Sequence, residues 1–146
     1  MIKTLQLSLS NAVATIAIVV AACASSGGNV PAPAKRVSLK DLVSSNQSHL
    51  LSIELGETKG LVMASMGAAT ATTRDGAVNN PWASESFTDK EGAEYEVLYY
   101  LTKTNVVFLP LSKSLTTPIV FKGGKVIGWG CDALQRATAD IRACNR

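Results

Sequence analysis

Two adjacent glycines, Gly123 and Gly124, stand between two apolar runs and constrain the fold more than any other feature of the chain. Glycine tolerates the positive φ angles of a two-residue β-turn, so residues 118–129 are predicted to form a β-hairpin. Counting outward from the turn predicts these pairs: Lys122 with Lys125, Phe121 with Val126, Val120 with Ile127, and Ile119 with Gly128. In this register Trp129 shares a face of the hairpin with Val120 and Ile127.

A second apolar segment, residues 94–102, predicts a strand that joins this hairpin. The segment is rich in aromatic and branched residues, which favour extended structure. Its side chains alternate between two faces, so Tyr99 lies on one face and Tyr100 on the other. Three consecutive strands joined by turns predict a three-stranded antiparallel sheet.

Two short helices are predicted ahead of these strands. Ser38, with Asp41 three residues on, has the spacing of a capping box, and apolar residues at helical spacing predict a helix over 39–54. A second, shorter helix begins after Thr58, which can cap its N-terminus, and is closed by Gly67.

These elements predict an α+β fold in which two N-terminal helices pack on a three-stranded antiparallel sheet, with a candidate short C-terminal helix. Residues 37–146 form a single domain in this interpretation, and residues 68–93, dominated by small, polar and turn residues, are expected to have little regular structure. The helices cover one face of the sheet. The other face is either an open apolar patch suited to docking, or covered by the C-terminal helix, by residues 68–93 or by a second copy of the chain.

Cys131 and Cys144 flank a good helix-forming segment, residues 132–143. A complete helix there would separate its ends by roughly 18 Å, whereas the Cα atoms of a disulfide lie about 4.4–6.8 Å apart. Two alternatives follow. Either the helix is a turn or two long, with a returning loop and a Cys131–Cys144 disulfide, or the thiols are separate. Metal binding by this pair is not expected, because two thiols are too few ligands.

Composition narrows the classes of function. The chain has 14 Lys and Arg against 11 Asp and Glu, and because the basic residues are scattered, a nucleic-acid surface is not expected. The one histidine, His49, would need a nucleophile and an orienting partner to act in catalysis, and the sequence shows no such pattern. We therefore expect a non-enzymatic protein with no catalytic residues, no metal, no cofactor and no evident small-molecule substrate.

The N-terminus resembles a bacterial lipoprotein signal peptide. A short basic start precedes an apolar stretch too short to span a bilayer, which ends in Val20-Ala-Ala-Cys23 like a lipobox. The resemblance implies that residues 1–22 are removed, that Cys23 is lipidated, and that residues 23–36, rich in Ser, Gly, Pro and Ala, form a flexible tether. The alternative is an ordinary secretory signal with a chance cysteine. Residue 24 is Ala, not the Asp that favours inner-membrane retention in enteric-type lipoproteins, so the resemblance implies the periplasmic face of the outer membrane.

Several blocks of sequence resemble an uncharacterised family of small Gram-negative lipoproteins. The blocks are Leu55-Gly-Glu-Thr-Lys-Gly-Leu-Val62, Asn80-Pro-Trp82 with Glu85, Tyr95-Glu-Val-Leu-Tyr-Tyr100, Thr117-Pro-Ile-Val-Phe121 and Gly124-Lys-Val-Ile-Gly-Trp-Gly130. That family is similar in fold to the BamE-like outer-membrane lipoproteins, which implies two helices on a three-stranded antiparallel sheet for residues 37–146. The family has no established reaction, so the resemblance implies fold and compartment better than activity.

The function predicted from these features is binding. A lipid-anchored envelope protein of this kind would act as an outer-membrane-associated interaction module whose partner is another envelope protein. Large aromatic residues are frequent anchors of such contacts, so the candidate partner-binding residues are Trp82, Tyr99, Tyr100 and Trp129. The alternative is a periplasmic ligand-binding or inhibitor-like module.

Overall fold

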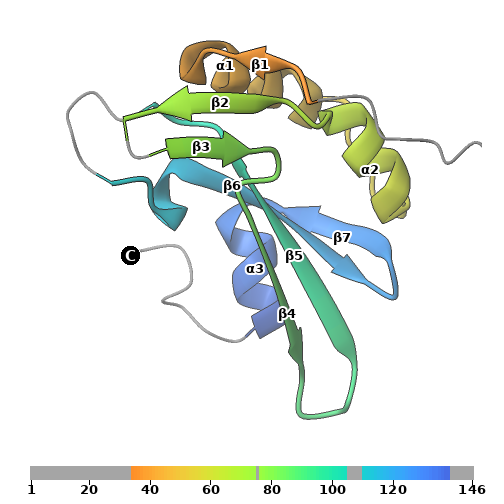
Figure 1. Ribbon diagram of the computed structural model, residues 1–146. Coiled ribbons are helices and arrows are strands. Elements are labelled where there is room, and N and C mark those ends of the chain that lie inside the picture. Colours follow the sequence, from red (N-terminus) through yellow and green to blue (C-terminus); the bar gives the residue numbers. More distant parts are fainter. Residues whose placement is uncertain (1–33, 75, 105–109, 139–146) are drawn as a thin grey trace, which may run out of the picture. The chain divides into compact units, whose positions relative to one another are not determined.

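The computed structural model describes residues 34–74, 76–104 and 110–138 (Figure 1). All of them belong to one compact unit, 32–146. Its elements in chain order are β1 (Arg36–Val37), α1 (Leu39–Leu50), α2 (Lys59–Met66), β2 (Thr70–Thr73), β3 (Gly76–Asn79), β4 (Ala83–Thr88), β5 (Glu94–Leu101), the 3-10 turn η1 (Lys113–Leu115), β6 (Thr116–Lys122), β7 (Lys125–Trp129) and α3 (Gly130–Thr138). The predicted signal peptide, Cys23 and Cys144 lie outside the described residues.

The strands form two sheets, so the prediction of a single three-stranded antiparallel sheet is wrong, although the class remains α+β. One sheet has the order β1-β2-β3, with β1 parallel to β2 and β2 antiparallel to β3. The other is antiparallel with the order β4-β5-β6-β7. The error arises in residues 68–93, where β2, β3 and β4 consist largely of Thr, Ala, Ser and Gly. Such strands are stabilised by pairing with distant residues, which local sequence does not reveal.

The helices begin as predicted, but the first ends early. The Ser38 side chain accepts a hydrogen bond from the Asp41 backbone N–H at 3.1 Å, and α1 ends at Leu50 instead of residue 54. Ile53 was the last apolar position of the predicted helix. It lies in the loop after α1, and its side chain is buried in the core. The second helix matches its prediction, with Thr58 as N-cap and Gly67 in a left-handed conformation just after its end.

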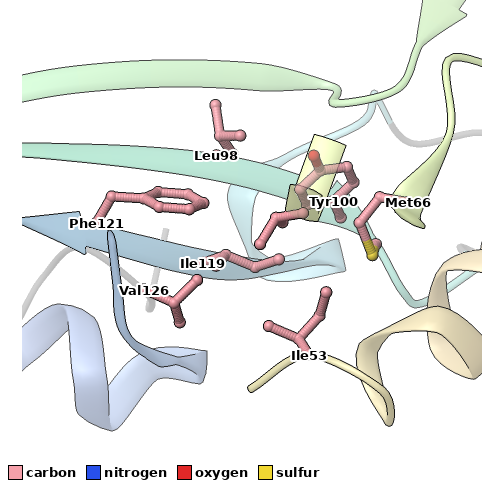
Figure 2. Packing of buried hydrophobic residues seen from close by; sticks show 8 residues of the cluster. Ile53, Met66, Leu98, Tyr100, Ile119, Phe121 and Val126 are labelled. Carbon is pink, nitrogen blue, oxygen red and sulfur yellow. The ribbon is translucent and has the colours of Figure 1, made fainter. Parts of the chain in front are cut away.

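Both faces of the four-stranded sheet are covered. On one face Ile53 and residues of α2 pack on β5, β6 and β7, and Figure 2 shows these side chains converging. This first core cluster contains Ile53, Val62, Met66, Leu98, Tyr100, Ile119, Phe121 and Val126. On the opposite face α3 covers a second cluster of Val97, Tyr99, Val120, Ala133 and Leu134. Of the alternatives for this second face, the C-terminal helix is therefore the one found.

The three-stranded sheet packs against α1. Leu42 and Val43 of α1 are buried against Ala71 of β2 and Val78 of β3, together with Leu101 at the end of β5. Because Leu101 belongs to the four-stranded sheet, this cluster joins the two sheets.

The β6–β7 hairpin follows the predicted register only near its tip. Lys122 pairs with Lys125 and Phe121 with Val126, as expected, but Val120 pairs with Gly128 and Ile119 with Trp129. A β-bulge that places one extra residue, Ile127, in β7 accounts for the shift. Trp129 therefore shares a face with Ile119 instead of Val120, which corrects the predicted position of Trp129.

Candidate docking surface

The described residues expose six large apolar side chains by at least 40%, and all six come from two segments of the chain. Leu51 and Leu55 lie in the connection between α1 and α2, Leu61 and Met63 lie on α2, and Ile127 and Trp129 lie on β7. Leu51 is the most exposed, at 89%, and Trp129 the least, at 40%. We call these six residues the apolar edge.

The two segments of the apolar edge are joined by backbone hydrogen bonds. The Gly56 N–H donates to the Val126 carbonyl at 2.8 Å, the Val126 N–H donates to the Glu57 carbonyl at 2.9 Å, and the Lys59 N–H donates to the Gly124 carbonyl at 2.9 Å. The first of these bonds connects the peptide group between Leu55 and Gly56 to the peptide group between Val126 and Ile127. The backbones next to Leu55 and Ile127 are therefore in direct contact.

Local structure explains why these side chains point outward. On α2, Val62 and Met66 lie four residues apart and are buried, so Leu61 and Met63 fall outside the buried stripe. On β7, Ile127 is the extra residue of the bulge and has no partner residue on β6. Its side chain is 42% exposed, whereas the neighbouring Val126 and Gly128 are buried. The hydrophobic core is complete without these side chains.

Of the four predicted partner-binding residues, only Trp129 belongs to the apolar edge. Tyr99 and Tyr100 are 2% and 0% exposed and lie in the core clusters on opposite faces of the sheet, so we do not retain them as docking residues. Trp82 is half-buried and packs against the α1 cluster as well as the α3 cluster.

Sequence reasoning missed the leucines of the apolar edge. Their only signal is that Leu61 falls off the helical stripe set by Val62 and Met66.

Two polar side chains near the surface, Glu85 and Lys113, contact Tyr99. Its hydroxyl donates to Glu85 Oε2 at 2.8 Å, Lys113 forms an ion pair with the other Glu85 oxygen, and Lys113 Nζ lies 5.0 Å from the centre of the Tyr99 ring. Burial acts to raise the pKa of Glu85, but the hydrogen bonds from Lys113 and Tyr99 outweigh it, so the pKa is lowered. Burial, followed by the hydrogen bond to Glu85, raises the pKa of Tyr99. Glu85 and Lys113 therefore fix the position of the Tyr99 side chain.

Tyr100 and His49 each carry a buried polar atom with no hydrogen-bond partner among the described residues. The atoms are the Tyr100 hydroxyl and His49 Nδ1. Burial raises the pKa of Tyr100 to about 12. Such a hydroxyl stays protonated at neutral pH, so it offers neither a base nor a charge for binding.

Cys131 at the start of α3 is disulfide-bonded. The helix begins at Gly130, two residues before the predicted start, and its described part ends at Thr138. Because Cys144 lies outside the described residues, its pairing with Cys131 stays a prediction.

Two further properties bear on function. Within residues 34–74, 76–104 and 110–138, no three His, Cys, Asp or Glu side chains gather in a way that could hold a metal ion. None of the helices in that part of the chain is long and apolar enough to cross a membrane.

Fold and surface together define a small α+β protein whose large exposed apolar residues, within the part described, lie on two segments joined by backbone hydrogen bonds. The chain belongs to the DUF3192 family, described as a protein of unknown function, and the match covers residues 21–136. None of the curated proteins and none of the solved structures compared with this chain matches it.

Proposed function

We propose that this protein is a lipid-anchored component of the cell envelope that acts by binding, with the apolar edge as its docking surface for another envelope protein. The observation that carries this proposal is that all six strongly exposed large apolar residues of the described part belong to two segments joined by backbone hydrogen bonds. Single exposed leucines are common on protein surfaces, whereas a contiguous apolar patch is typical of an interaction site.

The lipid anchor is supported by the sequence around Cys23. The Val20-Ala-Ala-Cys23 block follows an apolar stretch, and the region matched by the DUF3192 model begins at Ala21 and so includes the cysteine. Between Cys23 and β1 the chain can reach roughly 40 Å when extended. Such a tether would let the domain meet membrane proteins while the acyl chains, each CH2 contributing about 0.8 kcal/mol, hold it at the bilayer.

The apolar edge is large enough to contribute useful binding energy. Burying one Leu, Ile or Met side chain contributes roughly 1.5–3 kcal/mol, so several members of the edge together offset the entropy lost on association. Trp129 adds an aromatic side chain of the kind that dominates many interfaces. We assign no reaction to the protein, and we place it on the periplasmic face of the outer membrane because Ala24 follows the cysteine.

The anchor is tested by replacing Cys23 with Ser in cells fed a labelled fatty acid. We expect Cys23→Ser to lose the label and to leave the membrane fraction, while the control Ser25→Ala keeps both. If the Cys23→Ser chain still sediments with membranes and carries label, the protein is not a lipoprotein anchored at this residue.

The docking surface is tested by photo-crosslinking in intact cells. A photoreactive amino acid is placed at Leu55, Ile127 or Trp129, and as a control at Ala77, an exposed residue of β3 in the other sheet. We expect the three edge positions to crosslink to the same envelope protein and Ala77 not to. Crosslinks to unrelated proteins at every position would contradict the proposal, and a strong rise in melting temperature with a small molecule would favour a ligand-binding module.

A further inference from the structure

The two outer strands of the four-stranded sheet, β4 and β7, differ in their pairing with the rest of the described residues. The outer side of β7 is bonded to residues 56–59, whereas β4, at the opposite end of the order β4-β5-β6-β7, pairs only with β5 among the described residues. In an antiparallel sheet the N–H and C=O groups of every second residue of an edge strand point away from the sheet. Residues 83–88 thus offer a row of backbone donors and acceptors to an incoming strand.

This edge lacks most of the features that protect edge strands from pairing. Proteins commonly place proline, lysine or a bulge there, but β4 reads Ala-Ser-Glu-Ser-Phe-Thr and pairs with β5 without a register shift. Its one charge, Glu85, is bonded to Lys113 and Tyr99. At six residues β4 is also longer than β1 and β3, the outer strands of the other sheet.

Depressions lie on both faces of the sheet beside β4. One has a volume of about 320 Å³ and is lined by Ser86, Phe87, Thr88, Glu94, Tyr95, Glu96, Phe121 and Gly123. The second, of about 570 Å³, lies between the β4–β5 turn and the end of α3, and its lining includes Phe87, Tyr95 and Ala137. Ser86 pairs with Glu96 on one face and Phe87 with Tyr95 on the other, and the Phe87–Tyr95 pair lines both depressions.

The chemistry of the two depressions differs. Glu96 is paired with Lys59, but Glu94 has no ion pair with any residue of the described ranges, so the first depression offers a carboxylate to a cation. The second is lined by two acidic and two basic residues (Asp89, Glu91, Lys90 and Arg136) as well as by Phe87 and Tyr95. The rings of Phe87 and Tyr95 are stacked with their centres 5.1 Å apart and offer an aromatic surface to an apolar side chain.

We propose that β4 is a strand-addition site, at which an extended segment of a partner protein lies along residues 83–88. The side chains of an added strand alternate between the two faces, so a segment with alternating basic and apolar residues would place its cation beside Glu94 and its apolar side chain against Phe87 and Tyr95. This surface is separate from the apolar edge, and its test requires neither the lipid nor the docking partner of that edge.

The test is a selection of random eight-residue peptides from a displayed library on the purified full chain in detergent. We expect the selected peptides to alternate basic and apolar residues, and to protect amides of β4 from hydrogen exchange. Two N-methylated series of one selected peptide, modified at odd or at even positions, then separate backbone pairing from side-chain binding. Strand addition requires that one series loses about tenfold or more in affinity and the other keeps it.

Matched substitutions in the protein test the role of Glu94. We expect Glu94→Gln to weaken a basic selected peptide about tenfold, while Glu91→Gln, at an exposed carboxylate in the other depression, leaves its affinity within about twofold. The proposal is overturned if no peptide is enriched, if both N-methylated series bind alike, or if exchange protection appears at the apolar edge instead. A dimer in which β4 of one copy pairs with β4 of a second would overturn it as well.

Discussion

Asn46 and Asn80 exchange two side-chain hydrogen bonds inside the protein. Asn46 Nδ2 donates to Asn80 Oδ1 at 3.0 Å, and Asn80 Nδ2 donates to Asn46 Oδ1 at 2.9 Å. The remaining donors of this amide pair reach the Leu101 carbonyl on β5 and the Met66 carbonyl at the end of α2, each at 2.9 Å. The pair thereby connects α1, α2, the segment between β3 and β4, and β5.

Removing one amide of this pair should destabilise the fold strongly. Asn46 is 0% exposed, and Asn46→Ala deprives Asn80 Oδ1 and the Leu101 carbonyl of the amide that donates to them, although Asn80 Nδ2 keeps its bonds to the Met66 and Gly67 carbonyls. We expect a loss of about 2–4 kcal/mol in the free energy of unfolding. The control Gln47→Ala, on the exposed side of α1, removes only the bond to the Thr102 carbonyl and should cost about 1 kcal/mol. Urea denaturation measures both, and equal losses would contradict the assigned role of the pair.

Adjacent tyrosines in β5 should differ in how much stability they lose with their hydroxyls. Tyr99→Phe removes the hydrogen bond to Glu85 and should cost about 1 kcal/mol or more of unfolding free energy. Tyr100→Phe removes a buried hydroxyl that has no partner among the described residues, so stability should stay within about 0.5 kcal/mol or rise. Urea denaturation of the two variants under the same conditions compares them directly, and a larger loss for Tyr100→Phe would show that its hydroxyl is satisfied.

The packing of α3 on β7 should depend on the absence of a side chain at residue 128. A Cβ at Gly128 would lie 2.7 Å from the Ala133 Cβ, and Gly128 has φ +158°. Gly128→Ala should therefore destabilise the fold by about 1–3 kcal/mol, because the helix must move outward. Adding Ala133→Gly removes the clash and should recover part of the loss in a thermal or urea melt. Strictly additive losses in the double variant would mean that the two residues do not interact.

Acid should weaken the contact around Glu85. Its pKa is lowered in the folded protein, so the contact contributes stability above the ordinary pKa of 4.5 and loses it as pH falls through the lower folded-state pKa. We expect Glu85→Gln to reduce stability at pH 7 and to flatten the fall in stability between about pH 5 and pH 3. The side chain is nearly half exposed, so the effect should be modest and sensitive to salt. Urea midpoints across this range measure it, with Glu94→Gln as a carboxylate control, and parallel pH profiles of Glu85→Gln and the unsubstituted chain would argue against it.

Local sequence was sufficient wherever a few neighbouring residues decide the geometry. The caps at Ser38 and Thr58, the glycine after α2 and the tip of the β6–β7 hairpin were all predicted correctly, because each depends on side chains or φ angles within a few positions. The β-bulge at Ile127 was not predicted, because the local sequence of the hairpin carries no signal for it.

The candidate docking surface was likewise predicted only in part from local sequence. Trp129 was predicted as a partner-binding residue, but so were Tyr99 and Tyr100, which the two faces of the sheet bury. An aromatic residue in a strand has the same local signal whether a helix covers its face or not. Leu51 and Leu55 have no local mark of exposure, and Leu61 has only its place off the helical stripe of Val62 and Met66. The burial of Ile53, Val62 and Met66 in the core leaves these leucines outside.

By itself, the sequence determined the α+β class, both N-terminal helix starts, the strand at 94–101 and the turn at Gly123-Gly124. These follow from apolar periodicity, capping residues and the conformational freedom of glycine, which act over a few residues. Tertiary structure alone decided that residues 68–93 supply three strands and that α3 covers the second face of the sheet. It also decided that, within the described part of the chain, the residues of the apolar edge stay exposed and no strand pairs with the outer side of β4. The physical reason is that burial and strand pairing depend on which distant segments meet, and the free energy of those contacts outweighs weak local preferences.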